Sequence, residues 1–168
     1  NQALILGITL SFISVIALDY FTNRISASIL LLTILFYVFV YTIWLKRRTP
    51  QNIVIGGAAG AFPPVIGWTI ATGSLSIEPL TFFLIIFFWT PSHFWALSLY
   101  RSNDYKKANI PMLPLTNGIE STKINIFIYS LIMLPVIIFP YFIGFVELVF
   151  LLPALLLTFY YNYLCYDL

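Results

Sequence analysis

Residues 26–48 read SASILLLTILFYVFVYTIWLKRR, a stretch of twenty residues without a charge followed by three consecutive cations. A helix of about 20 mostly apolar residues is long enough to cross the hydrocarbon core of a bilayer. The segment is apolar on every face, whereas a helix of a soluble domain has one polar face. It therefore predicts a transmembrane helix over residues 26–45, ending just before Lys46.

The same pattern recurs along the 168 residues, of which 61% are hydrophobic and 8% charged. Further apolar stretches lie between the clusters of charge, and we expect six spans in all. They cover residues 3–18, 26–45, 53–72, 79–100, 124–145 and 148–166. The expected fold is an all-α membrane protein, a polytopic helical bundle of about six transmembrane helices forming a single domain over residues 1–168.

Seven of the eight basic residues fall in two loops that six spans place on one side of the membrane. Residues 46–48 follow the second span, and residues 101–123 join the fourth to the fifth. Only Arg24 lies on the other side. Because cytoplasmic loops carry an excess of lysine and arginine, we expect both loops to be cytoplasmic. The net charge of +2 reflects this topology and does not indicate a nucleic-acid partner.

The third span combines small residues with two prolines. Residues 56–61, GGAAGA, favour close packing of helices. Pro63 and Pro64 should kink the helix or open its backbone, either to line a cavity or to pack against a neighbour. The single cysteine, Cys165, excludes an internal disulfide and is interpreted as a packing residue.

The only histidine, His93, lies in the fourth span within residues 89–97, WTPSHFWAL. A lone histidine in a span is either hydrogen-bonded to a neighbouring helix or functional, as a proton donor or acceptor or as a ligand of heme iron. Trp89, Phe94 and Trp95 would suit a flat aromatic ligand, although most aromatic residues of a span are core or interfacial residues.

The loop after this span, RSNDYKKANIPMLP over residues 101–114, contains one carboxylate, Asp104, among several cations. Magnesium binds carboxylate and phosphate oxygens, and lysine or arginine neutralises the remaining charge of a diphosphate. The alternative is an ordinary solvated loop whose cations only set the topology. The stiff apolar segment Pro111–Pro114 favours the magnesium–diphosphate interpretation.

The other basic loop joins the second span to the third. Three cations end one helix and an amide pair opens the next, an arrangement that could bind an anion. The candidate residues are Tyr41, Lys46, Arg47, Arg48, Thr49, Gln51 and Asn52. A stop-transfer signal explains this loop equally well when it is taken alone. The anion-binding interpretation gains strength from the second basic loop, because both loops face the same side.

Four strings carry a resemblance to a known family: YTIWLKRRTPQN at 41–52, IGGAAGAFPP at 55–64, WTPSHFWAL at 89–97 and IPMLP at 110–114. They resemble the protoheme IX farnesyltransferase (heme O synthase) family, of the UbiA-type intramembrane prenyltransferase superfamily. The resemblance covers nearly all of the chain and is densest from Tyr41 to Thr122.

That resemblance implies nine transmembrane helices around a central cavity, with two aspartate-rich cytoplasmic loops that hold magnesium and a prenyl diphosphate. The chain corresponds to helices three to eight, with Asp104 in the second of these loops. The first aspartate-rich motif and the ninth helix are missing, so we expect an incomplete domain. Arg101 and Tyr105 stand where the superfamily has carboxylates.

The implied reaction transfers a farnesyl group from farnesyl diphosphate to the vinyl group of heme b, giving heme O and diphosphate. The cofactor is Mg²⁺, and heme b is a substrate. The resemblance assigns catalytic roles to Asp104 (also the metal ligand), Lys46, Arg47 and His93. It assigns substrate-binding roles to Gln51, Asn52, Trp89, Trp95, Arg101, Tyr105 and Lys107.

The partners expected from the resemblance are farnesyl diphosphate, heme b and the lipid bilayer, with heme A synthase or a terminal-oxidase assembly as protein partners. The expected location is a bacterial inner membrane. Two alternatives remain open at this point: a UbiA-type prenyltransferase that acts on a quinone precursor or a chlorin, and a non-catalytic heme- or isoprenoid-binding membrane subunit. A transporter half should show internal repeat symmetry, which we do not detect.

Overall fold

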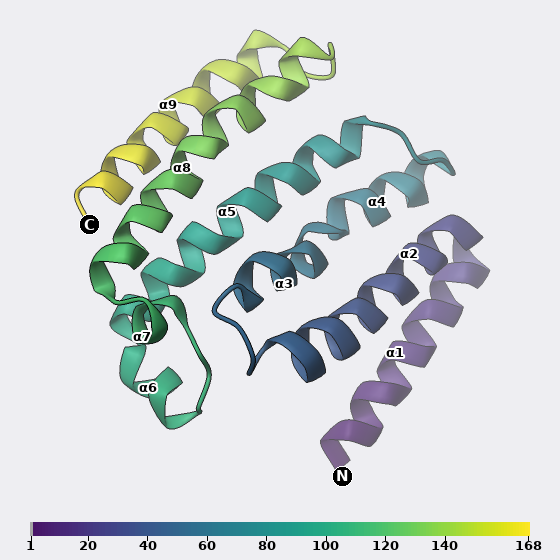
Figure 1. Ribbon diagram of the computed structural model, residues 1–168. Coiled ribbons are helices and arrows are strands. Elements are labelled where there is room, and N and C mark those ends of the chain that lie inside the picture. Colours follow the sequence, from purple (N-terminus) through teal and green to yellow (C-terminus); the bar gives the residue numbers. More distant parts are fainter. Residues whose placement is uncertain (1) are drawn as a thin grey trace.

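Every regular element in the computed structural model, which describes residues 2–168, is helical (Figure 1). The elements are α1 (Gln2–Phe21), α2 (Arg24–Leu35), the π-helix η1 (Phe36–Leu45), α3 (Asn52–Ala61), α4 (Pro63–Thr72), α5 (Glu78–Tyr100), α6 (Ser102–Lys107), α7 (Leu113–Thr116), α8 (Ile119–Phe142) and α9 (Leu148–Tyr166).

Six of these segments are long and apolar enough to cross a membrane, which confirms the six predicted spans. They are α1, α2 with η1, α3 with α4, α5, α8 and α9. The fifth span begins at Ile119, five residues earlier than predicted, because Gly118 with a φ of 85° turns the chain directly into α8. The protein is a multi-pass integral membrane protein.

Two of the spans are irregular. The third is interrupted at Phe62, and Pro63 and Pro64 begin α4. The predicted break at the double proline is thus confirmed. The second span changes from α-helix to π-helix at Phe36, and its last turn closes with a hydrogen bond from the Lys46 backbone N–H to the Tyr41 carbonyl, 2.8 Å.

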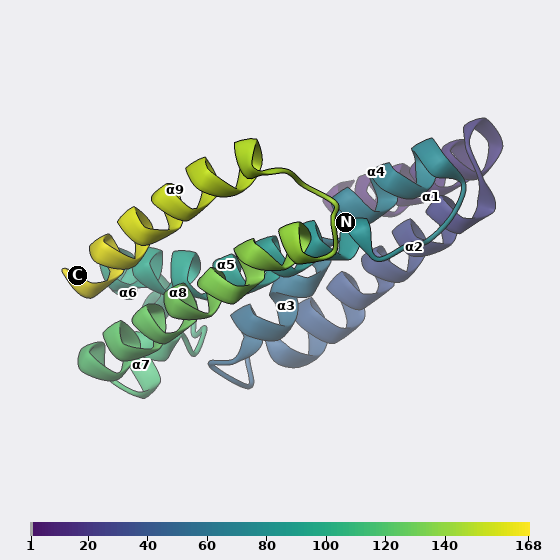
Figure 2. The same cartoon turned by 90° about the horizontal axis from the view of Figure 1, so that it is seen from above.

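The helices run up and down and lie side by side, with α1 and α9 at the two edges (Figures 1 and 2). The helix α5 is central: it packs against α3 and α4 on one side and α8 on the other. The short turns after α1, α4 and α8 lie at one end, and the two basic loops lie together at the other (Figure 1). This placement confirms that the two loops share a side.

A buried cluster holds the loop end together. It joins α3, α5, α8 and α9 to the start of α7, through Ile53, Trp95, Met112, Leu113, Ile126 and Cys165. Met112 and Leu113 belong to the stiff segment of the second loop, so that segment is part of the core rather than a free loop. Cys165 is buried, as expected of a packing residue. In contrast, α1 buries none of its side chains, and its apolar residues face outward as they would toward lipid.

Candidate active site

A cavity of about 370 Å³ lies between η1, α3 and α5. Its walls are mostly aromatic and its floor is rich in glycine: it is lined by Tyr37, Tyr41, Ile53, Gly56, Gly57, Gly60, Ile86, Trp89, Thr90 and Phe94. The helices α3 and α5 approach each other closely at these glycines. A Cβ atom added to Gly57 would stand 3.0 Å from Cγ2 of Thr90.

A second hollow, of about 620 Å³, lies at the turn between α8 and α9 and is lined by Tyr141, Phe142, Gly144, Val146, Glu147, Leu148 and Val149. It is larger, but it lies at the end away from the basic loops, and its one charged residue is the carboxylate Glu147. A negative charge repels an anionic ligand. The cavity between η1, α3 and α5 is therefore the better candidate for an active site.

His93 stands at the rim of this cavity. Its ring stacks on Trp89 with centroids 4.3 Å apart and an interplanar angle of 19°, and it meets the ring of Phe94 edge-on at 5.4 Å. Trp89 and Phe94 both line the cavity. The His93 side chain is exposed and has no hydrogen bond to any residue between 2 and 168. This geometry does not fit a histidine buried by a neighbouring helix.

Trp95, predicted from the same segment, lies elsewhere. Its side chain is fully buried in the loop-end core cluster and packs edge-on against Tyr129, with centroids 5.3 Å apart. The indole is thus surrounded by protein on every side, a position for packing rather than for contact with a ligand. Of the two predicted tryptophans, the structure brings only Trp89 to the cavity.

The first basic loop begins at the mouth of the cavity. Lys46 Nζ stands over the ring of the cavity-lining Tyr41, 5.7 Å from its centroid. Arg47 is exposed, as is Gln51 one residue before α3. Asn52 is fully buried: its Nδ2 donates to the Thr49 carbonyl at 2.6 Å, while its Oδ1 has no donor among residues 2–168.

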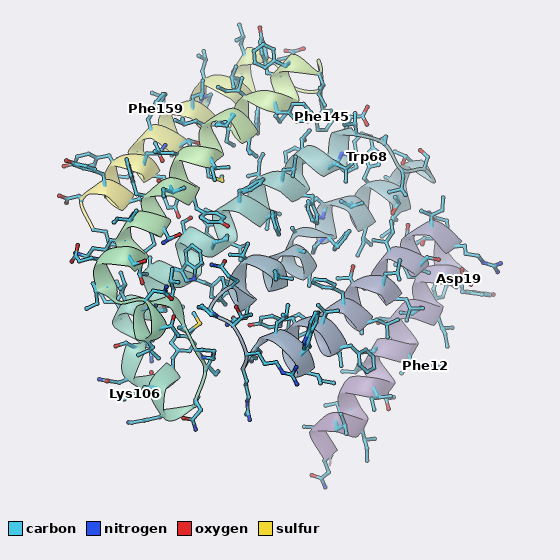
Figure 3. The ribbon with its side chains drawn as sticks, viewed as in Figure 1. Phe12, Asp19, Trp68, Lys106, Phe145 and Phe159 are labelled. Carbon is cyan, nitrogen blue, oxygen red and sulfur yellow. The ribbon has the colours of Figure 1, made fainter. Side chains whose placement is uncertain are left out.

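The second basic loop contains the short helix α6 where the sequence analysis expected a loop. Asp104 accepts a hydrogen bond from Arg101 in an ion pair, with Nη1 and Oδ2 3.3 Å apart. Both side chains are more than half exposed. Lys106 and Lys107 point outward from α6, and Figure 3 shows Lys106 at the end opposite Asp19. Arg101 is therefore engaged with Asp104, and the lysines are available to other anions.

The two loops meet through their aromatic and apolar residues. Tyr105 packs against the core cluster to which Ile53 of α3 belongs. Across residues 2–168 the ion pairs are Arg24–Asp19 and Arg101–Asp104, so the other six cations at the loop end have no carboxylate partner. Such an end of a bundle can bind a multiply charged anion.

The sequence model of the UbiA prenyltransferase family matches residues 1–168. The chain belongs to the UbiA prenyltransferase family. This confirms the resemblance found in the four strings. The UbiA-family chain is 81% identical over 168 residues to a protein of Pelagibacter ubique named protoheme IX farnesyltransferase, a match that covers 100% of this chain and 55% of that protein.

Two further relatives carry the same name. A protein of Parvibaculum lavamentivorans is 57% identical over 145 residues, covering 86% of this chain and 46% of its own length. A protein of Ehrlichia ruminantium is 59% identical over 140 residues, covering 83% and 48%. The UbiA-family chain thus spans about half the length of the curated relatives it matches. No solved structure matches it.

The UbiA-family chain offers limited ligands to a metal ion. Within residues 2–168 no group of three or more His, Cys, Asp or Glu side chains could hold one. Asp104 is a single exposed carboxylate at the loop end. Because magnesium is commonly held by one or two carboxylates together with substrate phosphates, this set fits an ion shared with a diphosphate. It does not fit a metal site built from these residues alone.

Sequence reasoning did not select Tyr37 or Gly56 as site residues, whereas it grouped Tyr41 with the cations of the first basic loop. All three line the cavity of the UbiA-family chain. A signal was present: Tyr37 and Tyr41 are four residues apart, so they share a helix face just before the cations. Gly56 gave no such signal, because its role depends on what approaches it.

Proposed function

We propose that this chain forms part of the catalytic domain of a protoheme IX farnesyltransferase. The enzyme transfers the farnesyl group of farnesyl diphosphate to the vinyl group of heme b, giving heme O and diphosphate. The identity of 81% over all 168 residues to a protein of that name carries the proposal. The geometry agrees with it, because a cavity lined largely by apolar and aromatic side chains lies beside a cationic end.

The cationic end promotes departure of the diphosphate. The bond between the allylic carbon and oxygen breaks more easily as the negative charge on the leaving group is neutralised. Lys46 at the cavity mouth and the exposed Arg47 and Lys107 supply positive charge there. Asp104 would hold a magnesium ion together with the diphosphate, and that ion would supply further charge neutralisation. Arg101 fixes the orientation of the Asp104 carboxylate through their ion pair.

The cavity walls then protect the farnesyl cation. Tyr37, Trp89 and Phe94 present aromatic side chains to the cavity, which attract a cation and exclude water. The vinyl π electrons of heme b form the new carbon–carbon bond, and the positive charge moves to the porphyrin side chain. Water adds to that carbon and releases a proton, leaving a hydroxyl group. We place heme b against the exposed His93–Trp89 pair at the rim, where the imidazole orients the porphyrin or accepts the proton.

We further propose a bacterial inner membrane as the location, with both basic loops in the cytoplasm. The positive-inside rule supports this orientation, since seven of the eight basic residues lie at the loop end. Heme A synthase or a terminal-oxidase assembly would receive heme O directly, because so apolar a product leaves a membrane enzyme most readily toward another membrane protein.

The test is the heme profile of membranes, by liquid chromatography and mass spectrometry. Cells lacking heme O synthase would express the complete protein that contains this chain, as wild type, as Asp104→Ala and as Asp19→Ala. Asp19 is a matched control: it too forms an ion pair with an arginine, Arg24 Nε to Oδ1 at 3.6 Å, but at the opposite end of the bundle (Figure 3).

We expect a heme heavier than heme b by a farnesyl and a hydroxyl group in the wild type and in Asp19→Ala, and its loss in Asp104→Ala. Only heme b in all three samples would contradict the proposal. A prenylated quinone precursor or chlorin would instead identify a different acceptor for the same fold.

A further inference from the structure

Tyr41 connects the cavity to the first basic loop. We propose that Tyr41, seated against Gly56, holds Lys46 at the cavity mouth as a preset cation for the diphosphate of the substrate. This inference rests on the proposed function and deepens it, because it assigns positioning roles to Tyr41 and Gly56 within the same site. Tyr41 is a positioning residue in this account, and Lys46 is the residue that meets the substrate.

The π-helix places Lys46 above Tyr41. In an α-helix, residues three and four apart are neighbours, and a residue five positions later lies on another face. In η1 the backbone N–H of Lys46 donates to the carbonyl of Tyr41, five residues earlier, at 2.8 Å. The wider turn brings the Lys46 ammonium over the Tyr41 ring, 5.7 Å from its centroid. π-Helical turns are rare and occur frequently at functional sites.

The Tyr41 ring packs directly against Gly56 of α3. A Cβ atom added at Gly56 would lie 2.6 Å from Cε2 and 2.9 Å from Cγ of Tyr41, and closer still to Cδ2. No side chain larger than hydrogen fits there without moving the ring. On the same helix face, Tyr37 lies with its ring centroid 5.2 Å from that of Tyr41. The ring is thus packed between α3 and its own helix, and its face stays turned toward Lys46.

A cation held this way remains available to a substrate. A lysine ammonium has three N–H donors, and the contact with a ring face leaves donors free for phosphate oxygens. Lys46 is only half-exposed, whereas Arg47 and Arg48 are exposed. A long side chain loses rotamer freedom when it binds a ligand. Because the Tyr41 ring already restricts the Lys46 side chain, less of that freedom is lost when the diphosphate binds. The contribution should therefore be observed in the KM for farnesyl diphosphate.

The experiment measures heme O formation by the complete purified protein, with farnesyl diphosphate varied. Tyr41→Leu removes the ring, Tyr41→Phe keeps it without the hydroxyl, and Gly56→Ala displaces it. Gly67→Ala is the matched control, because Gly67 lies in α4, away from the residues that line the cavity, and a Cβ there has no neighbour within 4 Å. Each of these variants except Gly67→Ala is also made in a Lys46→Met background.

We expect Tyr41→Leu and Gly56→Ala to raise the KM about five- to thirty-fold, the range for a cation–π contact of about 1–2 kcal/mol. Tyr41→Phe and Gly67→Ala should stay within about twofold of wild type. In the Lys46→Met background, Tyr41→Leu should raise the KM no further, because the cation it positions is gone. A ring that only shapes the cavity would still show its full effect there.

The inference is overturned if the wild type makes heme O and Tyr41→Leu leaves the KM within about twofold, or if its effect persists in the Lys46→Met background. Should Tyr41→Leu fail to fold, the KM of Gly56→Ala takes its place. An unchanged KM, or a rise in KM that persists in the Lys46→Met background, then overturns the inference. A wild type that makes no heme O refutes the proposed function itself, which separates the two failures.

Discussion

The contact between α3 and α5 at Gly57 gives a prediction whose size follows from the structure. A Cβ on Gly57 would lie 3.0 Å from Cγ2 and 3.2 Å from Cβ of Thr90, whereas a Cβ on Gly60 would meet nothing within 4 Å. Both glycines lie in α3, so replacement by alanine adds a similar helix propensity, about 1 kcal/mol, at each. The difference between the two variants therefore isolates the packing conflict at Thr90.

Adding a methyl group to a well-packed interior typically costs about 1–3 kcal/mol. We predict that Gly60→Ala stabilises the protein by up to about 1 kcal/mol and that Gly57→Ala is about 1–3 kcal/mol less stable than Gly60→Ala. Thr90→Ser removes Cγ2 but keeps the hydroxyl that donates to the Ile86 carbonyl at 2.6 Å. It should recover part of the loss, since only the contact with Cβ remains.

The assay is the free energy of unfolding of the complete protein in mixed detergent micelles, followed by circular dichroism. Equal stability of Gly57→Ala and Gly60→Ala would show that a Cβ at Gly57 causes no packing conflict with Thr90. So would a Gly57→Ala, Thr90→Ser double variant that is no more stable than Gly57→Ala alone, because the conflict would then lie elsewhere.

Three further predictions concern polar contacts. The hydroxyls of Ser92 and Tyr161 lie 2.7 Å apart and link α5 to α9. A double-mutant cycle of Ser92→Ala and Tyr161→Phe should therefore give a coupling of about 0.6 kcal/mol in the free energy of unfolding, and additive losses would contradict it. Asn23 accepts a hydrogen bond from the Ser26 N–H at 2.9 Å and donates one to the Thr69 carbonyl at 2.7 Å. Asn23→Ala should therefore lower the free energy of unfolding by about 1–2 kcal/mol. A loss smaller than that of the neighbouring variant Thr22→Ala would contradict this prediction. Asp104→Asn should change that free energy by less than about 1 kcal/mol, because its ion pair is exposed, yet lower heme O formation at least about tenfold; a parallel loss of stability and activity would argue for a structural role.

The sequence predicted the six spans and the shared side of the two basic loops because charge is so costly in hydrocarbon that its positions mark the ends of the helices. It also predicted the break in the third span, since proline cannot supply the backbone N–H that a continuous helix needs there. The helix α6 was foreseeable as well: Asp104 in its first turn and two lysines in its last turn complement the helix dipole.

The faces of the helices could not be predicted in the same way. Trp89 and Trp95 lie six residues apart in one apolar helix, yet one lines the cavity and the other is buried in the core. A helix that is apolar on every side has no hydrophobic stripe to show which face turns inward. The π-helix could not be predicted for the same reason. A change from α-helical to π-helical periodicity cannot be detected in the sequence of a uniformly apolar segment.

In the proposed reaction, the cavity between η1, α3 and α5 receives the prenyl diphosphate from the cationic end. Photolabelling of the complete protein with a benzophenone-bearing farnesyl diphosphate analogue, followed by peptide mass spectrometry, tests it most directly. We expect labels at Tyr41, Trp89 and Phe94, and we expect excess farnesyl diphosphate to suppress them. Suppressible labels confined to residues 141–149, at the hollow between α8 and α9, would contradict it.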